Sequence, residues 1–215
     1  MAARRSFSAL GKLTSCGTAT RILGPLVDAV DHTNVAIRRF LGAKTMSRSC
    51  TLKGNVLSLS GPELKVGDTA PDATLKSSLV DDFKLSQAAG RTRIYSVVPS
   101  LDTPVCAEQT KRFNEEIAGL PNIDFYTIST DLPVAMSRFC GAEGIDTDKF
   151  KVLSDHMDVS FGKAYGTLLP DLRIETRAVF VIGKDDKIKY VEYVPEISNH
   201  PNYEEILSCA KEISS

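Results

Sequence analysis

Cys106 is the residue of this chain that is best placed to do chemistry. It ends the segment 99–106, which leaves a β-branched, strand-like run and enters a predicted helix through Thr103 and Pro104. Free N–H groups and the positive end of the helix dipole lie at a helix N-terminus, and they favour the nucleophilic thiolate of a cysteine there. The alternative is that Cys106 is only a small buried hydrophobic residue. Its position alone gives the two interpretations about equal weight.

Thr103 stands where a C-x-x-C dithiol motif would carry its first cysteine, three residues before Cys106. A hydroxyl group can donate a hydrogen bond to a sulfur or to a bound oxygen, but it cannot form a disulfide. A threonine at 103 with a cysteine at 106 therefore disfavours dithiol exchange at this helix start. It favours attack of Cys106 on an exogenous oxidant.

The segment around Cys106 resembles the peroxiredoxins, whose signature P-x-x-x-T-x-x-C is matched by Pro99, Thr103 and Cys106. Two further blocks, at 131–133 and 137–144, are similar to the bacterial thiol peroxidases, an atypical two-cysteine group within that family. Three separate blocks agree in order and spacing. The resemblance is therefore much more specific than T-x-x-C alone.

The resemblance implies a thiol-specific peroxidase that reduces hydrogen peroxide and organic hydroperoxides to water and alcohols. Cys106 would be the peroxidatic cysteine, whose thiolate attacks one peroxide oxygen and becomes a sulfenic acid. Cys140 would be the resolving cysteine, which attacks that sulfenic acid and forms an intramolecular Cys106–Cys140 disulfide. Thioredoxin or a similar dithiol protein would then reduce the disulfide. Neither a metal nor an organic cofactor would be needed.

Three more residues receive roles from the same resemblance. The Thr103 hydroxyl, with the backbone N–H groups near Val105 and Cys106, would stabilise the charge that develops on the peroxide oxygens. Arg177, at the start of a late strand, would favour the thiolate and hold the peroxide. Pro99 would shield the sulfur from water. The alternative for Arg177 is a solvent-facing residue at a strand start.

Cys106 and Cys140 fall on different predicted helices, which matters for the implied disulfide. A disulfide requires the two Cα atoms to lie within about 7 Å of each other, and cysteines on separate packed helices are usually farther apart. We therefore expect both segments to unwind locally in each turnover. Gly141 and Gly144, which follow Cys140, fit such loosening.

The remaining cysteines and the histidines match nothing in this pattern. Cys209 falls on the last predicted helix, where a role in the core or no particular role is expected rather than a catalytic one. An odd number of scattered cysteines does not form the dense framework of a small secreted domain. The histidines are too dispersed to form a metal site with the cysteines. The residues concerned are Cys16, Cys50, Cys209, His32, His156 and His200.

The elements that must position these residues alternate between strand and helix signals from Thr51 onward. This order predicts an α/β protein with a thioredoxin-like fold, a central mixed sheet flanked by helices and an N-terminal β-hairpin. The predicted strands are 52–53 and 56–59 (the hairpin, joined by Gly54 and Asn55), 74–79, 93–98, 123–129, 152–153, 178–182 and 188–194. The predicted helices are 85–89, 103–118, 131–140, 159–164 and 202–213.

The composition is that of an ordinary globular protein and excludes several classes. Among 215 residues, 42% are hydrophobic and 25% are charged, and 26 Lys+Arg against 27 Asp+Glu give a net charge of -1. No strong field would recruit nucleic acid or an anionic membrane surface. The apolar runs, such as 94–98, are far shorter than the roughly 18 residues of a membrane-spanning helix.

Residues 1–45 differ from the rest of the chain. They carry seven basic residues and only two acidic ones, Asp28 and Asp31, as in an Arg-rich, acid-poor organellar transit peptide. The two acids and Gly24-Pro25 interrupt that pattern and favour a plain extension or an unused upstream start. We divide the chain into an N-terminal extension (1–48) and a thioredoxin-fold peroxiredoxin domain (49–215). The expected location is the cytoplasm, or the mitochondrial matrix if 1–45 is a transit peptide.

Two other functions compete with the peroxidase. One is a peroxide sensor or redox relay that passes the oxidation of Cys106 to a partner protein, although a resolving cysteine in the same chain would intercept it. The other is a binding module with an inactive site. The resemblance also implies a homodimer formed through the face that carries the active site. It places Tyr165, Leu168 and Leu169 beside that site, where they would suit long alkyl hydroperoxides.

Overall fold

The computed structural model describes residues 48–120, 122–147 and 150–214. The predicted extension, with Cys16 and His32, lies outside this range except for Arg48. In chain order the elements are β1 (Ser49–Leu52), β2 (Asn55–Ser58), β3 (Thr74–Lys76), β4 (Asp82–Lys84), the 3-10 helix η1 (Leu85–Ala88), β5 (Thr92–Val97), α2 (Pro104–Ile117), β6 (Ile123–Ser129), α3 (Pro133–Glu143), β7 (Phe150–Ser154), α4 (Ser160–Tyr165), β8 (Leu168–Leu169), β9 (Ile174–Glu175), β10 (Ala178–Ile182), β11 (Ile188–Tyr193) and α5 (Tyr203–Ser214).

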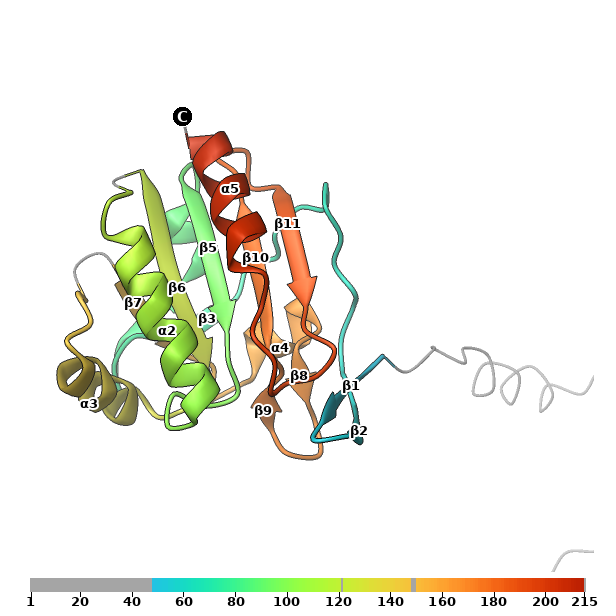
Figure 1. The fold of residues 1–215 in the computed structure, drawn as a ribbon. Helices are drawn as coiled ribbons and strands as arrows, with labels where there is room; N and C mark the ends of the chain where they lie inside the picture. Colours follow the sequence, from blue (N-terminus) through green and yellow to red (C-terminus); the bar gives the residue numbers. More distant parts are fainter. Residues whose placement is uncertain (1–47, 121, 148–149, 215) are drawn as a thin grey trace, which may run out of the picture. The chain divides into compact units, whose positions relative to one another are not determined.

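A seven-stranded mixed sheet in the order β11-β10-β5-β6-β7-β3-β4 forms the centre of the protein. Strands β5, β6 and β7 are parallel, and β10 pairs antiparallel with β5 and β11. Helices α2 and α5 lie on the near side of the sheet in Figure 1, and α4 lies behind it. This arrangement confirms the predicted thioredoxin-like α/β fold with helices on both faces.

The central strand β5 shows why the sheet needs both helical layers. All of its residues are buried, although successive side chains of a strand point to opposite faces. Ile94 packs in the cluster that contains residues of α2, α3 and α5, whereas Tyr95 and Val97 pack in the cluster that contains α4. Because helices cover both faces, β5 has no solvent-facing side, and its polar residues Thr92, Arg93 and Ser96 are buried as well.

The predicted N-terminal hairpin is confirmed, with its turn one residue earlier than expected. Leu52 pairs with Asn55, so the two turn residues are Lys53 and Gly54, with φ values of 50° and 79°. A two-residue hairpin turn of this kind needs positive φ at both positions. Lys53 adopts that backbone, and Asn55 belongs to the second strand.

Several element predictions were wrong in extent; the strand predicted at 152–153, for example, spans 150–154 as β7. The strand predicted at 74–79 ends at Lys76, because Ser78 and Asp81 hydrogen-bond each other and turn the chain into β4, which was not predicted. Helix α3 runs past Cys140 to Glu143, and Gly144, with φ 65°, ends it. Glycine at this position accepts the left-handed backbone that closes a helix.

The short pair β8–β9 was also not predicted. It lies between α4 and β10 in sequence and brings the chain to Arg177. Among the residues that the structure describes, none belongs to a helix with both the length and the hydropathy to cross a bilayer.

Candidate active site

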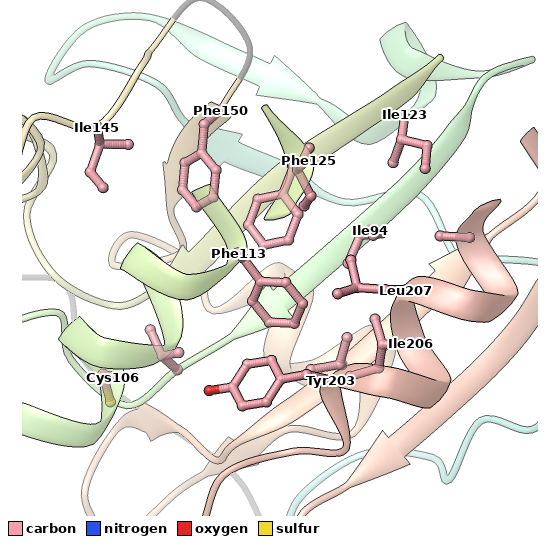
Figure 2. Close-up of a cluster of buried hydrophobic side chains, with 14 of the residues drawn as sticks. Ile94, Cys106, Phe113, Ile123, Phe125, Ile145, Phe150, Tyr203, Ile206 and Leu207 are labelled. Carbon is pink, nitrogen blue, oxygen red and sulfur yellow. The ribbon is translucent and has the colours of Figure 1, made fainter. Parts of the chain in front are cut away.

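Cys106 is the third residue of α2, and the local sequence explains why the helix begins there. Thr103 takes the N-cap position with extended backbone angles, its carbonyl accepts from the Ala107 N–H (2.9 Å), and Pro104 occupies the first helical position. Proline is favoured there because its fixed φ suits a helix and its missing N–H would have no partner. The Cys106 side chain is fully buried, at the end of the hydrophobic cluster in Figure 2.

Arg177 is the charged residue in contact with Cys106. It lies between β9 and β10, is 1% exposed, and its Nη2 donates to the Cys106 Sγ over 3.2 Å. The other donors of the guanidinium bond neutral groups, since Nη1 donates to the Gln109 Oε1 (2.5 Å) and Nε donates to the Ile197 carbonyl (2.7 Å). The sulfur is the one partner among these three that can become an anion.

Gln109 was not singled out from the sequence. It lies three residues after Cys106 on the same face of α2 and is fully buried. Its Oε1 accepts from Arg177, while its Nε2 donates to the Ser96 hydroxyl of β5 over 2.7 Å. Gln109 thus fixes the guanidinium plane to the central sheet. The feature of the sequence that could have indicated Gln109 is a polar residue three positions after the cysteine, on the same helix face.

Thr103 and Pro99 flank the cysteine. The Thr103 side chain is exposed, and its hydroxyl hydrogen is donated to the Ser100 carbonyl (3.0 Å). This use of the hydrogen differs from the expected donation to the peroxide, and it leaves the oxygen lone pairs to accept a hydrogen bond from a bound peroxide. Pro99 is buried two residues after the end of β5, in the loop that leads to α2.

Cys140 lies within the intact helix α3, is 2% exposed, and belongs to the same hydrophobic cluster as Cys106. Both thiols are free. Burial raises the pKa of the Cys140 thiol above its ordinary value. Because each sulfur is buried within its own helix, the expectation that both segments open for a disulfide remains a prediction.

Tyr203 and His200 border the site and were not predicted to do so. Figure 2 shows the Tyr203 hydroxyl directed toward the side of the cluster that holds Cys106, and Tyr203 interacts electrostatically with both Cys106 and Arg177. The hydroxyl is 2.8 Å from the Nδ1 of His200, and Arg112 stacks on the ring at 3.9 Å. Burial raises the pKa of Tyr203 to about 12. Its hydroxyl therefore stays protonated.

Cys50 and Cys209, the other two cysteines among the described residues, make different contacts. Cys50 is buried and accepts a hydrogen bond from the Thr176 hydroxyl (3.4 Å), and Cys209 is half-buried on α5 against the core. Burial raises the pKa of both thiols. Within the three described stretches, no group of three or more His, Cys, Asp or Glu is arranged to hold a metal ion. Tyr165, Leu168 and Leu169, which the resemblance places beside the active site, are buried.

The chain is similar to known proteins over the part that carries this site. The family model described as Redoxin matches residues 65–207. A thiol peroxidase of Bacillus subtilis is 50% identical over 161 residues, which cover 75% of this chain and 95% of that protein. A thiol peroxidase of Listeria innocua is 47% identical over 161 residues, with 75% and 96% covered.

Solved structures agree with these sequence matches. A peroxiredoxin-like protein from Aquifex aeolicus has a TM-score of 0.72 at 42% identity, covering 78% of this chain and 98% of that chain. The thiol peroxidase from Chromobacterium violaceum has a TM-score of 0.69 at 17% identity, covering 76% and 95%. At that low identity the second likeness supports the fold alone.

Proposed function

Because this chain belongs to the Redoxin family and is a thiol peroxidase of the bacterial type, we propose that Cys106 attacks the peroxide and that Cys140 resolves the product. The observation that carries the first assignment is the 3.2 Å contact between the Arg177 Nη2 and the Cys106 sulfur, at the start of a helix. Helix start and guanidinium both favour the thiolate, which is the reactive form. The substrates are peroxides, and the electrons come from a thiol reductant.

The proposed first step is an in-line displacement at one peroxide oxygen. The Cys106 thiolate forms an S–O bond, the O–O bond breaks, and the leaving oxygen takes up a proton to become water or an alcohol. Negative charge moves from the sulfur to the leaving oxygen during this step. Arg177 and the N–H groups of the first turn of α2 would stabilise the negative charge as it moves to the leaving oxygen. Thr103 would orient the peroxide. Pro99 would keep water away from the sulfur.

The proposed second step joins the two cysteines. The Cys140 thiolate attacks the sulfur of the Cys106 sulfenic acid, an S–S bond forms, and the hydroxyl group leaves as water after protonation. Thioredoxin or a similar dithiol protein would return both cysteines to thiols. A homodimer and a cytoplasmic location are part of this proposal, with the mitochondrial matrix as the alternative if residues 1–45 are a transit peptide.

Peroxide titration tests the two roles separately. After one equivalent of peroxide, the reduced wild type should lose two thiols and two hydrogens by intact mass. Cys140→Ser should instead hold a sulfenic acid at Cys106, which a 1,3-diketone probe traps. Cys209→Ser should behave as the wild type. A Cys106 that stays a thiol at micromolar peroxide would overturn the first assignment.

The sensor alternative makes a different prediction. Full peroxide turnover that requires only a thioredoxin system supports the peroxidase. Mixed disulfides between Cys106 and a partner protein, formed by the wild-type chain while Cys140 is present, would favour the relay instead.

A further inference from the structure

Asp131 joins the loop before Cys106 to the start of the helix that carries Cys140. Its Oδ1 accepts from the Ser100 hydroxyl (2.8 Å), and its Oδ2 accepts from the Leu101 N–H (2.7 Å) and the Ser129 hydroxyl (2.9 Å). Three donors on one half-buried carboxylate make a strong anchor, because hydrogen bonds to a charged acceptor are about twice as strong as neutral ones.

The anchor lies at the junction of the two helix starts. Ser100 and Leu101 come just before the N-cap of α2, and Asp131 comes two residues before Pro133, where α3 begins. The Asp131 carbonyl also accepts from the Ser154 hydroxyl at the end of β7 (2.5 Å). One residue therefore ties both helix starts to the sheet.

A second polar contact joins the same two segments. The Arg138 Nη2 of α3 donates to the Asp102 carboxylate of the loop over 3.0 Å, in an exposed ion pair. Helix α3 also borders a cavity of about 450 Å³, which Ser137, Cys140 and Gly141 help to line. A helix that is incompletely packed on one side depends more on the polar contacts at its start.

We propose that Asp131 is a positioning residue that latches the Cys106 loop to α3 and sets how fast Cys140 resolves the Cys106 sulfenic acid. The inference rests on the proposed function. Both sulfurs are buried in intact helices, so the S–S bond forms only after a local opening, and this opening breaks the bonds to Ser100 and Leu101. While the latch is closed, the sulfenic acid is exposed to a second peroxide molecule. That molecule transfers an oxygen to the sulfur, giving a sulfinic acid and water or an alcohol.

The latch predicts that weaker contacts speed resolution and reduce overoxidation. Asp131→Asn keeps the shape but removes the charge, and should form the Cys106–Cys140 disulfide about tenfold faster once the sulfenic acid exists. Ser100→Ala removes one donor and should give about a threefold increase. Rapid acid quench after one equivalent of peroxide, followed by thiol alkylation and intact mass, separates sulfenic acid, disulfide and sulfinic acid.

Controls separate the latch from the proposed function and from a general loss of structure. Arg138→Gln should give up to a threefold increase in resolution, because exposed ion pairs are weak. Lys189→Gln removes an ion pair with Asp185 that lies elsewhere in the chain, and should change nothing. Unfolding temperatures show whether each variant is folded. A purely structural role would slow both peroxide attack and resolution.

Two results have distinct meanings. If Cys106 of the wild type is not oxidised, the proposed function fails. If Cys106 is oxidised at the normal rate but Asp131→Asn and Ser100→Ala resolve at the wild-type rate or slower, with unchanged or higher sulfinic acid at excess peroxide, the latch is wrong and the peroxidase assignment stands.

Discussion

The Nη2 of the Arg177 guanidinium lies 3.2 Å from the Cys106 sulfur, and each of the three guanidinium nitrogens donates one hydrogen bond. Buried charge without a partner is costly. Here the sulfur is the contacted group that can supply a negative charge, because the Gln109 amide and the Ile197 carbonyl are neutral. The fold has therefore placed a cation in its interior beside the sulfur that we propose as the nucleophile.

Replacing Arg177 with lysine should cost at least about 100-fold in the rate of peroxide reduction. The ammonium is a point charge that cannot reach the sulfur, Gln109 and Ile197 together, and loss of one oriented donor typically costs 10² to 10³ in rate. Stopped-flow consumption of peroxide measures the effect. Arg93→Lys is the matched control, since Arg93 is 2% exposed on β5 but bonds the Ala88 carbonyl and Asp186. It should lose stability and keep the rate.

Gln109→Leu should reduce the same rate by about tenfold. The leucine removes the acceptor of the Arg177 Nη1 and frees the guanidinium plane from the Ser96 hydroxyl, so the sulfur contact is less well fixed. Thr110→Val is the control in the next position of the helix. Thr110 is also fully buried, and its hydroxyl has no hydrogen-bond partner among the residues described. An equal loss of rate in both variants would show that packing in α2 is responsible.

Thr103 should tolerate serine better than valine. The hydroxyl donates its hydrogen to the Ser100 carbonyl, and its oxygen is left to accept from the peroxide O–H. Serine keeps both functions and should stay within about threefold of the wild-type rate, whereas valine removes them and should lose about 100-fold. The readout is the dependence of initial rate on peroxide concentration. A valine variant with the wild-type rate would show that the hydroxyl takes no part.

Local signals in the sequence predicted the elements of the site, but not the contacts between them. Proline at the first helical position marks the starts of α2 and α3, and β6 spans the predicted residues 123–129. The contact of Arg177 with Gln109 joins residues 68 positions apart. No periodicity encodes such a pair, since it depends on how α2 packs against the sheet. The likeness to peroxiredoxins indicated Arg177, and Gln109 appeared only in the folded structure.

A buried carboxyl pair lies close to the active site in sequence and was not predicted either. Glu175, two residues before Arg177, is fully buried and accepts from the Thr167 hydroxyl (2.5 Å), while its other oxygen has no donor among the described residues. It interacts with Asp155, which accepts from the Phe161 and Gly162 N–H groups. Burial raises the pKa of Glu175 to about 8 and that of Asp155 as well. The N–H donors hold the charge on Asp155, so the proton belongs to Glu175.

This proton makes folding stability depend on pH in a defined direction. The pKa of Glu175 is about 4.5 in an unfolded chain and about 8 in the folded protein. Between these values the folded state binds a proton that the unfolded state has released, so stability falls as pH rises, by up to about 1.4 kcal/mol per pH unit. The contribution is fully present below pH 4.5 and is lost as pH passes through 8.

Glu175→Gln should remove this dependence, because the amide reproduces the protonated acid. Its N–H₂ group can donate to Asp155 while its oxygen accepts from Thr167. Urea unfolding of the reduced protein from pH 5 to pH 9 should show the variant gaining stability over the wild type as pH rises. Glu196→Gln is the control: hydrogen bonds from Ser198, Thr51 and Lys53 lower the pKa of Glu196 to about 2, so its difference from the wild type should be constant above pH 6. A difference for Glu175→Gln that is equally flat would mean that Glu175 is ionised in the folded protein.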